Sequence, residues 1–388
     1  MKIAIATFAG LPNPPVKGGA VEALIDDICK INEIKNQLSI DVFSVYDKAA
    51  IEASNTYRNT NFIFYKKYIS RRINKKSIAY KLFHRSIPDK TMSGIIKLIN
   101  QNKYDYVIIT SINYEMEYIF QAIHSKVIWY LHGDPLSVLQ AEAIKKITEH
   151  CAAVITVSDF VNKRVSSVLP KCKVITVRNC TDLQPISLSE EDSVRQEIRG
   201  KIGITDNDKL IVYIGRITPI KGIYELVEAF VFADIPNTKL LIVGTPSEEG
   251  EERYFDKIKG VANQNVYYWG YAVHDSLNKL YCAADCIAAP SVCQEAALLI
   301  ALEASICNRP LITTNIGGIP EYTDDNAIMI EYDAKFREHL IEAMKVACAY
   351  KVEPKKNNTK RKFVDEFYDD FYKALKQLNK EINTLCQE

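Results

Sequence analysis

Residues 210–230 read LIVYIGRITPIKGIYELVEAF: a short apolar run, a glycine-flanked turn and then an amphipathic stretch. The run is typical of a strand buried on both faces of a parallel sheet, and the amphipathic stretch is typical of a helix that packs on it. Strand, turn and helix in this order form the repeating unit of doubly wound α/β domains. The segment therefore predicts the fold class.

The same pattern extends along the chain in both directions. The other runs are KIAIAT, IDVFSVY, YDYVIIT, KVIWYL, AAVITVS and KVITV in the first half, and KLLIVG, VYYWG, CIAAPS and PLITTN in the second. Two series predict two Rossmann-like domains, because polar residues 178–193 separate them. We place the first domain at 1–182 and the second at 183–362. Residues 363–388 predict an amphipathic helix or helix pair.

The composition excludes several classes of protein. The chain has 388 residues and a formal net charge of +1, which argues against a nucleic-acid binder. The start, MKIAIATF, reads as a strand instead of a secretory signal, and no apolar run is long enough for a membrane span. We expect a cytoplasmic protein with reduced thiols. Cys282, Cys286 and Cys293 lack the paired spacing of a zinc site, so we interpret them as small buried hydrophobes.

One segment is unusually basic. Residues 65–90, YKKYISRRINKKSIAYKLFHRSIPDK, carry many lysines and arginines and the single acid Asp89. Such a segment can lie on an anionic membrane surface. The alternative is a solvated helix pair with ordinary surface lysines.

Two of the strand-to-helix turns indicate anion binding, because ligands of this fold lie at the carboxyl ends of the strands. Gly18 and Gly19 stand where a helix begins, which either exposes N–H groups to an anion or simply makes a tight turn. Arg216 and Lys221 flank a proline turn. Together they can reach one phosphate cluster, and the alternative is surface charge on a loop.

The other two turns carry acids or glycines. In residues 294–303, QEAALLIALE, the acids Glu295 and Glu303 lie on either side of seven residues that cannot ionise. Residues 310–322 contain the pair Gly317 and Gly318, which taken alone indicates no more than a turn.

Together the four turns resemble family 4 retaining glycosyltransferases. The matching order is GG after the first strand, then GR-x-x-x-x-KG, PS-x-x-x-E-x7-E and N-x-GG-x-PE. The linker RNCTD is similar to the family's N-G-V-D, and PPVKGGAVE resembles members that build bacterial surface polysaccharides and coats. The resemblance implies the GT-B fold, in which two Rossmann-like domains face a central cleft. A C-terminal helix then crosses back to the first domain.

The resemblance also implies roles for individual residues. Glu303 would accept hydrogen bonds from the ribose, and Glu295 would contact the transferred sugar. Arg216 and Lys221 would hold the diphosphate and act as catalytic residues with Glu295 and His132. The wider nucleotide-sugar site would include Gly18, Gly19, Gly215, Gly270, Tyr271, Ala296, Ala297, Leu298, Leu299 and Glu303.

His132, in YLHGD, resembles the family histidine of the sugar pocket; taken alone, it would more simply be a structural histidine. Gly270 and Tyr271 resemble the loop that reads the base. Two departures from the family pattern stand out. EAAL, residues 295–298, replaces E-G-F-G or E-P-F-G, so Ala296 and Leu298 are expected to narrow the sugar space. Cys180 and Thr181 replace the usual glycine and valine of the linker.

The expected reaction transfers a sugar, hexosyl in type, from a nucleotide-diphosphate sugar with retention of configuration. UDP is expected in preference to GDP, and the acceptor is a glycan or lipid-linked glycan, with peripheral contact at the inner membrane face through residues 65–90. If 294–303 is helical, Glu295 and Glu303 lie about 12 Å apart. That spacing excludes the close carboxylate pair of a double displacement and favours front-face transfer.

No cofactor or metal is expected. Asp206-Asn207-Asp208 resembles the metal signature of another glycosyltransferase fold, but it precedes a strand and is interpreted as a turn. The alternatives are a GT-B scaffold that lost transfer, suggested by EAAL, and a sugar-nucleotide epimerase of the same fold.

Overall fold

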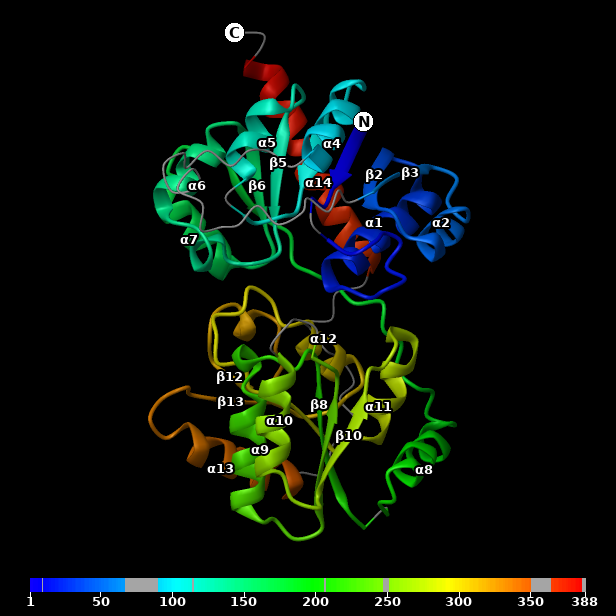
Figure 1. Ribbon diagram of the computed structural model, residues 1–388, viewed down its shortest axis with the longest axis vertical. Coiled ribbons are helices and arrows are strands. Elements are labelled where there is room, and N and C mark those ends of the chain that lie inside the picture. The colour runs from blue at the N-terminus through cyan, green and yellow to red at the C-terminus, as the bar shows by residue number, and fades with distance from the viewer. Residues whose placement is uncertain are drawn as a thin grey trace. The chain divides into compact units, whose positions relative to one another are not determined.

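The computed structural model describes residues 1–8, 10–66, 90–113, 115–205, 207–246, 251–349 and 364–385. The chain divides into two compact units (Figure 1). Unit 1 comprises Met1–Asn179 and Phe363–Glu388, and unit 2 comprises Cys180–Lys362. The division at Asn179 lies slightly before the predicted boundary at 182. Most of the basic segment, residues 67–89, lies outside the described residues.

Unit 1 is built on a parallel sheet with the strand order β3-β2-β1-β4-β5-β6-β7. Its strands are β1 Lys2–Ala6, β2 Ser39–Val45, β3 Thr60–Tyr65, β4 Tyr106–Ile109, β5 Val127–Leu131, β6 Cys151–Thr156 and β7 Val174–Thr176. Its helices are α1 Ala20–Lys35, α2 Lys48–Ser54, α4 Lys90–Asn100, α5 Met116–Ala122, α6 Ala141–Thr148, α7 Asp159–Val168 and α14 Val364–Leu385. The order reverses direction between β1 and β4, which makes this the switch point of the sheet.

Unit 2 has a second parallel sheet, with the order β10-β9-β8-β11-β12-β13. Its strands are β8 Lys209–Ile214, β9 Thr238–Val243, β10 Val266–Gly270, β11 Cys286–Ala289, β12 Leu311–Thr314 and β13 Ala327–Ile330. Its helices are α8 Glu191–Lys201, α9 Ile223–Ala233, α10 Glu251–Val261, α11 Leu277–Ala283, α12 Leu299–Ile306 and α13 Phe336–Ala349. The switch point lies between β8 and β11.

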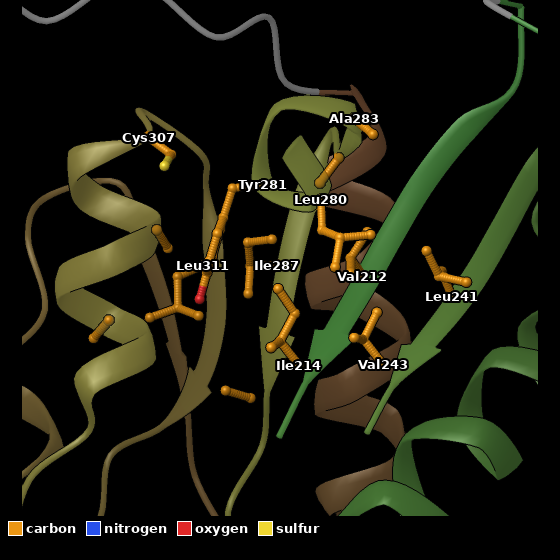
Figure 2. Close-up of a cluster of buried hydrophobic side chains, with 14 of the residues drawn as sticks. Val212, Ile214, Leu241, Val243, Leu280, Tyr281, Ala283, Ile287, Cys307 and Leu311 are labelled. Atoms are coloured by element: carbon orange, nitrogen blue, oxygen red, sulfur yellow. The ribbon is translucent and has the colours of Figure 1, made fainter. Parts of the chain in front are cut away.

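The apolar runs predicted from the sequence are buried on both faces of these sheets. On β8, Val212 and Ile214 join one core cluster, which Figure 2 shows together with Leu241 and Val243 of β9. Their neighbour Tyr213 points to the opposite face and belongs to a second cluster. Alternation along a strand therefore supplies two apolar layers, which explains why the runs contain almost no polar residues.

The C-terminal tail forms one long helix, α14, that belongs to unit 1 as predicted. Phe367, Phe371 and Leu375 form a fully buried stripe at helical spacing. Lys35 at the end of α1 pairs with Asp369 at 2.6 Å, and the Tyr368 hydroxyl donates to Asn32 Oδ1 at 2.8 Å. Apolar burial and these polar contacts together hold the tail on α1.

Two strands, β3 and β13, were absent from the sequence prediction. Both are edge strands whose short apolar stretches, FIFY and AIMI, are mostly half-buried, and the sequence analysis did not recognise them as strands. Among the described helices, none is long and apolar enough to cross a bilayer.

Candidate active site

The loops that follow β8, β11 and β12 leave the carboxyl edge of the unit 2 sheet on both sides of its switch point. Crevices of this kind are where ligands of doubly wound folds bind. Arg216 and Lys221 lie in the first of these loops, Glu295 in the second, and Gly317 and Gly318 in the third. The fold therefore brings three of the four predicted turns to one edge.

The first loop turns sharply at Gly215. A Cβ atom on Gly244, at the end of β9, would lie 1.8 Å from the Gly215 carbonyl oxygen, so the ends of β8 and β9 touch through glycine backbone. The Tyr213 hydroxyl donates to the Arg216 carbonyl at 2.7 Å and closes the turn. The Arg216 side chain is exposed and forms no ion pair within the described part of the chain. Its guanidinium is available to an anion.

Lys221 ends a short 3-10 turn, Pro219–Lys221, and pairs with Glu295. Its Nζ lies 2.5 Å from Glu295 Oε1, and the Ser291 hydroxyl donates to the same oxygen at 2.7 Å. The two loops also touch through backbone, because a Cβ on Gly222 would lie 2.1 Å from the Pro290 carbonyl oxygen. The loops after β8 and β11 are therefore in contact through their backbones as well as through the Lys221–Glu295 ion pair.

The three charged groups share one neighbourhood. Arg216, Lys221 and Glu295 all act electrostatically on the Cys293 thiol, whose pKa is raised mainly by burial. Two cations around one carboxylate leave this part of the site with an excess of positive charge. Such an arrangement suits a ligand that brings further negative charge.

The third loop, which follows β12, contacts the backbone of Glu295. Gly317 has φ 64°, and a Cβ there would lie 2.5 Å from the Glu295 carbonyl oxygen and 2.9 Å from its nitrogen. The Gly318 N–H donates to the Glu295 carbonyl at 2.7 Å. The second glycine pair, predicted as a turn, thus also positions Glu295.

Glu303 lies on α12 and is buried. The hydroxyl of Tyr281, on α11, donates to Glu303 Oε2 at 2.5 Å. Burial raises the pKa of Glu303, and the Tyr281 hydrogen bond opposes that rise. No hydrogen bond between described residues occupies Glu303 Oε1, and none joins Glu303 to the Lys221–Glu295 pair.

The helix expected over 294–303 begins later than predicted. Helix α12 starts at Leu299, and residues 294–298 form a loop, so a helical rise cannot set the separation of Glu295 and Glu303. Leu298 was expected to narrow the sugar space, but its side chain packs in the apolar core. Ala296 is also buried, while Ala297 and Leu299 pack at the edge of that core.

Gly270 is the last residue of the edge strand β10, and Tyr271 follows it. Gly270 has φ 85°, and its carbonyl accepts from the Gly244 N–H at 2.8 Å. Tyr271 is 60% exposed, so its ring is free to meet a flat ligand. In the acidic motif before β8, Asp208 Oδ2 accepts from the Thr205 N–H and hydroxyl, both at 2.9 Å. This is the predicted turn at the described part of that motif.

In unit 1, Gly18 and Gly19 precede α1 with φ values of 73° and 105°. Gly19 caps the helix without a side-chain hydrogen bond, and the Gly18 N–H donates to the Pro15 carbonyl at 2.9 Å. Glu22 is buried here, and its Oε1 accepts from the Leu11 N–H at 2.9 Å. A Cβ on Gly19 would lie 2.2 Å from Glu22 Oε2, so the loop closes tightly over this carboxylate.

His132 directly follows β5 in the same unit. Its ring packs at a tilt of 35° against the Tyr130 ring, with ring centroids 4.2 Å apart, and both of its nitrogens are buried without a hydrogen-bond partner among the described residues. Burial lowers the pKa of His132 to about 3, so the imidazole is neutral at physiological pH. Unlike Asp134, which caps a turn and pairs with Arg164 at 2.8 Å, His132 has no structural bond that accounts for its position.

Sequence reasoning missed four residues that build the site: Glu22, Tyr213, Tyr281 and Ser291. Glu22 and Ser291 stand within the quoted motifs GGAVE and PS-x-x-x-E, so their spacing was a usable signal. The tyrosines lie in apolar runs and look like core residues in the sequence.

The fold is that of the GT-B enzymes. The chain superposes on Anabaena HepE, solved in complex with UDP and glucose, with a TM-score of 0.68 and 16% identity over 97% of this chain and 99% of HepE. Sucrose-phosphate synthase from Thermosynechococcus elongatus gives a TM-score of 0.68 and 17% identity over 100% of this chain and 98% of that enzyme.

The sequence matches are to glycosyltransferases. Residues 194–361, which lie in the second unit, match the model of the Glycosyl transferases group 1, in agreement with the resemblance. The Putative glycosyltransferase YtcC of Bacillus subtilis (strain 168) is 24% identical over 332 residues, 82% of this chain and 76% of YtcC. The Spore coat protein SA of the same organism is 23% identical over 341 residues, 84% of each chain.

The role of Gly317 gives a first prediction. Gly317→Ala forces a positive φ on alanine and drives its Cβ into the Glu295 backbone, so we expect a loss of roughly 2 kcal/mol or more in the free energy of unfolding. The matched control is Gly260→Ala in α10, where no atom lies within 4 Å of the added Cβ and a helical alanine stabilises by up to about 1 kcal/mol. Equal urea midpoints for the two variants would show that the close contact between Gly317 and the Glu295 backbone does not affect stability.

A second prediction concerns pH. Folded His132 resists protonation down to about pH 3, whereas the unfolded chain takes up this proton near pH 6.5. The unfolded state thus binds more protons below pH 6.5, and stability must fall as the pH is lowered from there. Between pH 7 and 5 the loss is about 2 kcal/mol. We expect the unfolding temperature of wild type to fall more over this interval than that of His132→Asn; equal falls would contradict a buried neutral imidazole.

Proposed function

We propose that this glycosyltransferase moves a sugar from a nucleotide-diphosphate sugar, a UDP-sugar in preference to a GDP-sugar, to a glycan or lipid-linked glycan with retention of configuration. The observation that carries the proposal is the cluster of Arg216, Lys221 and Glu295 at the carboxyl edge of the unit 2 sheet. It offers two cations to a diphosphate and one carboxylate to sugar hydroxyls. The UDP and glucose bound by HepE support this choice of donor.

We assign the parts of the donor to residues along the carboxyl edge of the unit 2 sheet. The base stacks near Gly270 and Tyr271, and the ribose hydroxyls donate to Glu303. Arg216 and Lys221 bind the diphosphate with the N–H groups at the start of α12, near Leu298 and Leu299, where the helix dipole favours an anion.

The remaining proposed contacts involve the transferred sugar and residues of unit 1. Glu295 accepts from the sugar hydroxyls. Neutral His132 offers one nitrogen as donor and the other as acceptor to a sugar hydroxyl. The N–H groups at the start of α1, next to Gly19, add donors for the leaving diphosphate, whereas the Gly18 N–H is taken by the Pro15 carbonyl.

The proposed transfer is front-face and passes through an oxocarbenium-like state. The anomeric C–O bond breaks with its electron pair moving to the diphosphate oxygen. The acceptor oxygen bonds to the same face, and its proton passes to that diphosphate oxygen. No carboxylate acts as nucleophile in this proposal: Lys221 and Ser291 hold Glu295 Oε1 and Tyr281 holds Glu303 Oε2, and the other oxygen of each acid is assigned to donor hydroxyls. Rate enhancement then comes from electrostatic stabilisation of the leaving group.

The acceptor and the cellular role extend this proposal. The names of the relatives include a spore coat protein, which supports a role in building surface polysaccharides or coats. Membrane contact through residues 65–90 stays a prediction, as does a cytoplasmic location. The core position of Leu298 removes one reason for inferring a scaffold without activity, since this side chain takes no space from the sugar.

Transfer assays with a panel of nucleotide sugars test the proposal. Arg216→Ala and Lys221→Ala should each lower turnover by roughly two orders of magnitude or more, because each removes a charge that stabilises the leaving diphosphate. The matched control is Lys201→Ala, which removes an exposed lysine on α8 and should leave the rate unchanged. We also propose metal-independent transfer, so excess chelator should not change the rate. Near-wild-type turnover in both site variants would overturn the assigned donor site.

A further inference from the structure

We propose that Tyr281 is a positioning residue for donor recognition: its buried hydroxyl holds Glu303 Oε2 so that Oε1 faces the ribose hydroxyls. The proposal rests on the donor site described above and adds to it a residue that touches no part of the donor. The Tyr281 hydroxyl lies 2.5 Å from Glu303 Oε2.

The Tyr281 ring is fixed by apolar packing. The residue has no exposed surface, and Figure 2 shows its ring between Ile287 of β11 and Leu311 of β12 within one core cluster. A ring clamped between two strands of the central sheet leaves its hydroxyl little freedom to move. Glu303 is thereby tied to the sheet as well as to its own helix.

The backbone around Tyr281 is fixed as well. Arg309 Nε donates to the Tyr281 carbonyl at 2.9 Å, and Arg199 Nε donates to the Ala283 carbonyl at 3.1 Å. Arg195 adds a hydrogen bond to the same Ala283 carbonyl at 3.0 Å. Three guanidinium groups therefore bind the last carbonyls of α11, where the helix dipole favours cations. This end of the helix is anchored in the body of unit 2.

Each arginine of this anchor pairs with an acid of unit 2. Asp285 accepts from Arg195 and Arg199 at 2.7 and 2.5 Å, and Glu191 pairs with Arg309. The arginines are explained by their support of α11, and Tyr281 is the residue through which α11 contacts Glu303.

The direction of the hydrogen bond follows from burial. Burial raises the pKa of Tyr281 far above its usual value, so the hydroxyl keeps its proton and donates it. Glu303 then accepts on Oε2, and a carboxylate that accepts on one oxygen retains the full capacity of the other. Free rotation of the carboxylate would average the two oxygens, and the Tyr281 bond prevents this.

Tyr213 provides a matched control within the same unit. It is equally buried, and its hydroxyl donates at 2.7 Å to the Arg216 carbonyl. Tyr213→Phe and Tyr281→Phe therefore remove the same group from comparable surroundings. One hydroxyl supports the loop assigned to the diphosphate, and the other supports the residue assigned to the ribose.

The experiment measures dissociation constants of UDP and 2′,3′-dideoxy-UDP by titration calorimetry, or of the GDP pair if GDP binds more tightly. Wild type should bind the dideoxy form at least about tenfold more weakly, because it lacks the groups that donate to Glu303. In Tyr281→Phe this ratio should fall to within about threefold, while in Tyr213→Phe it should keep its wild-type value. Loss of packing alone would weaken both ligands alike and leave the ratio unchanged.

Glu303→Gln gives an independent route to the same answer. It too should reduce the ratio, and the double variant with Tyr281→Phe should lose no more than either single variant, because both act on the same hydroxyls. An unchanged ratio in Tyr281→Phe, or an equal fall in Tyr213→Phe, overturns the positioning role while the donor site stands. A wild-type ratio near one overturns the ribose role of Glu303, and the proposal falls with it.

Discussion

The ion pair between Lys221 and Glu295 is the contact on which the proposed donor site depends. It joins the loop after β8 to the loop after β11, across the switch point of the sheet, with 2.5 Å between Nζ and Oε1. Both side chains are largely buried, where losing one partner costs far more than at a surface. The pair thus restrains both groups before any ligand arrives, and it leaves Arg216 as the cation without a competing partner in the described chain.

Glycine contacts make this restraint possible. At Gly222 and Gly317 a Cβ would lie within about 2.5 Å of a backbone oxygen in the neighbouring loop, and Gly244 meets the end of β8 in the same way. Loops that pack backbone against backbone take their positions from the strands below them. A site built on them is placed by the most ordered part of the unit, which is what accurate electrostatic stabilisation requires.

The sequence predicted the parallel sheets, the two units and the turns of the candidate site, because each leaves a local pattern of apolar runs and glycines. It did not predict edge strands β3 and β13, whose apolar stretches are short and whose half-burial comes from their position at the sheet edges. Nor did it predict the start of α12: residues 294–298 have good helix formers, but the contact with Gly317 and Gly318 holds Glu295 in a loop. Tyr281 was missed because its partner Glu303 is 22 residues away in the chain.

A crystal structure of the chain with UDP tests the central claim most directly. We expect the β-phosphate within hydrogen-bond distance of Arg216 and Lys221, and the ribose hydroxyls on Glu303 Oε1 with Tyr281 still bonded to Oε2. UDP bound away from the switch point of unit 2, or with its ribose turned from Glu303, would contradict it.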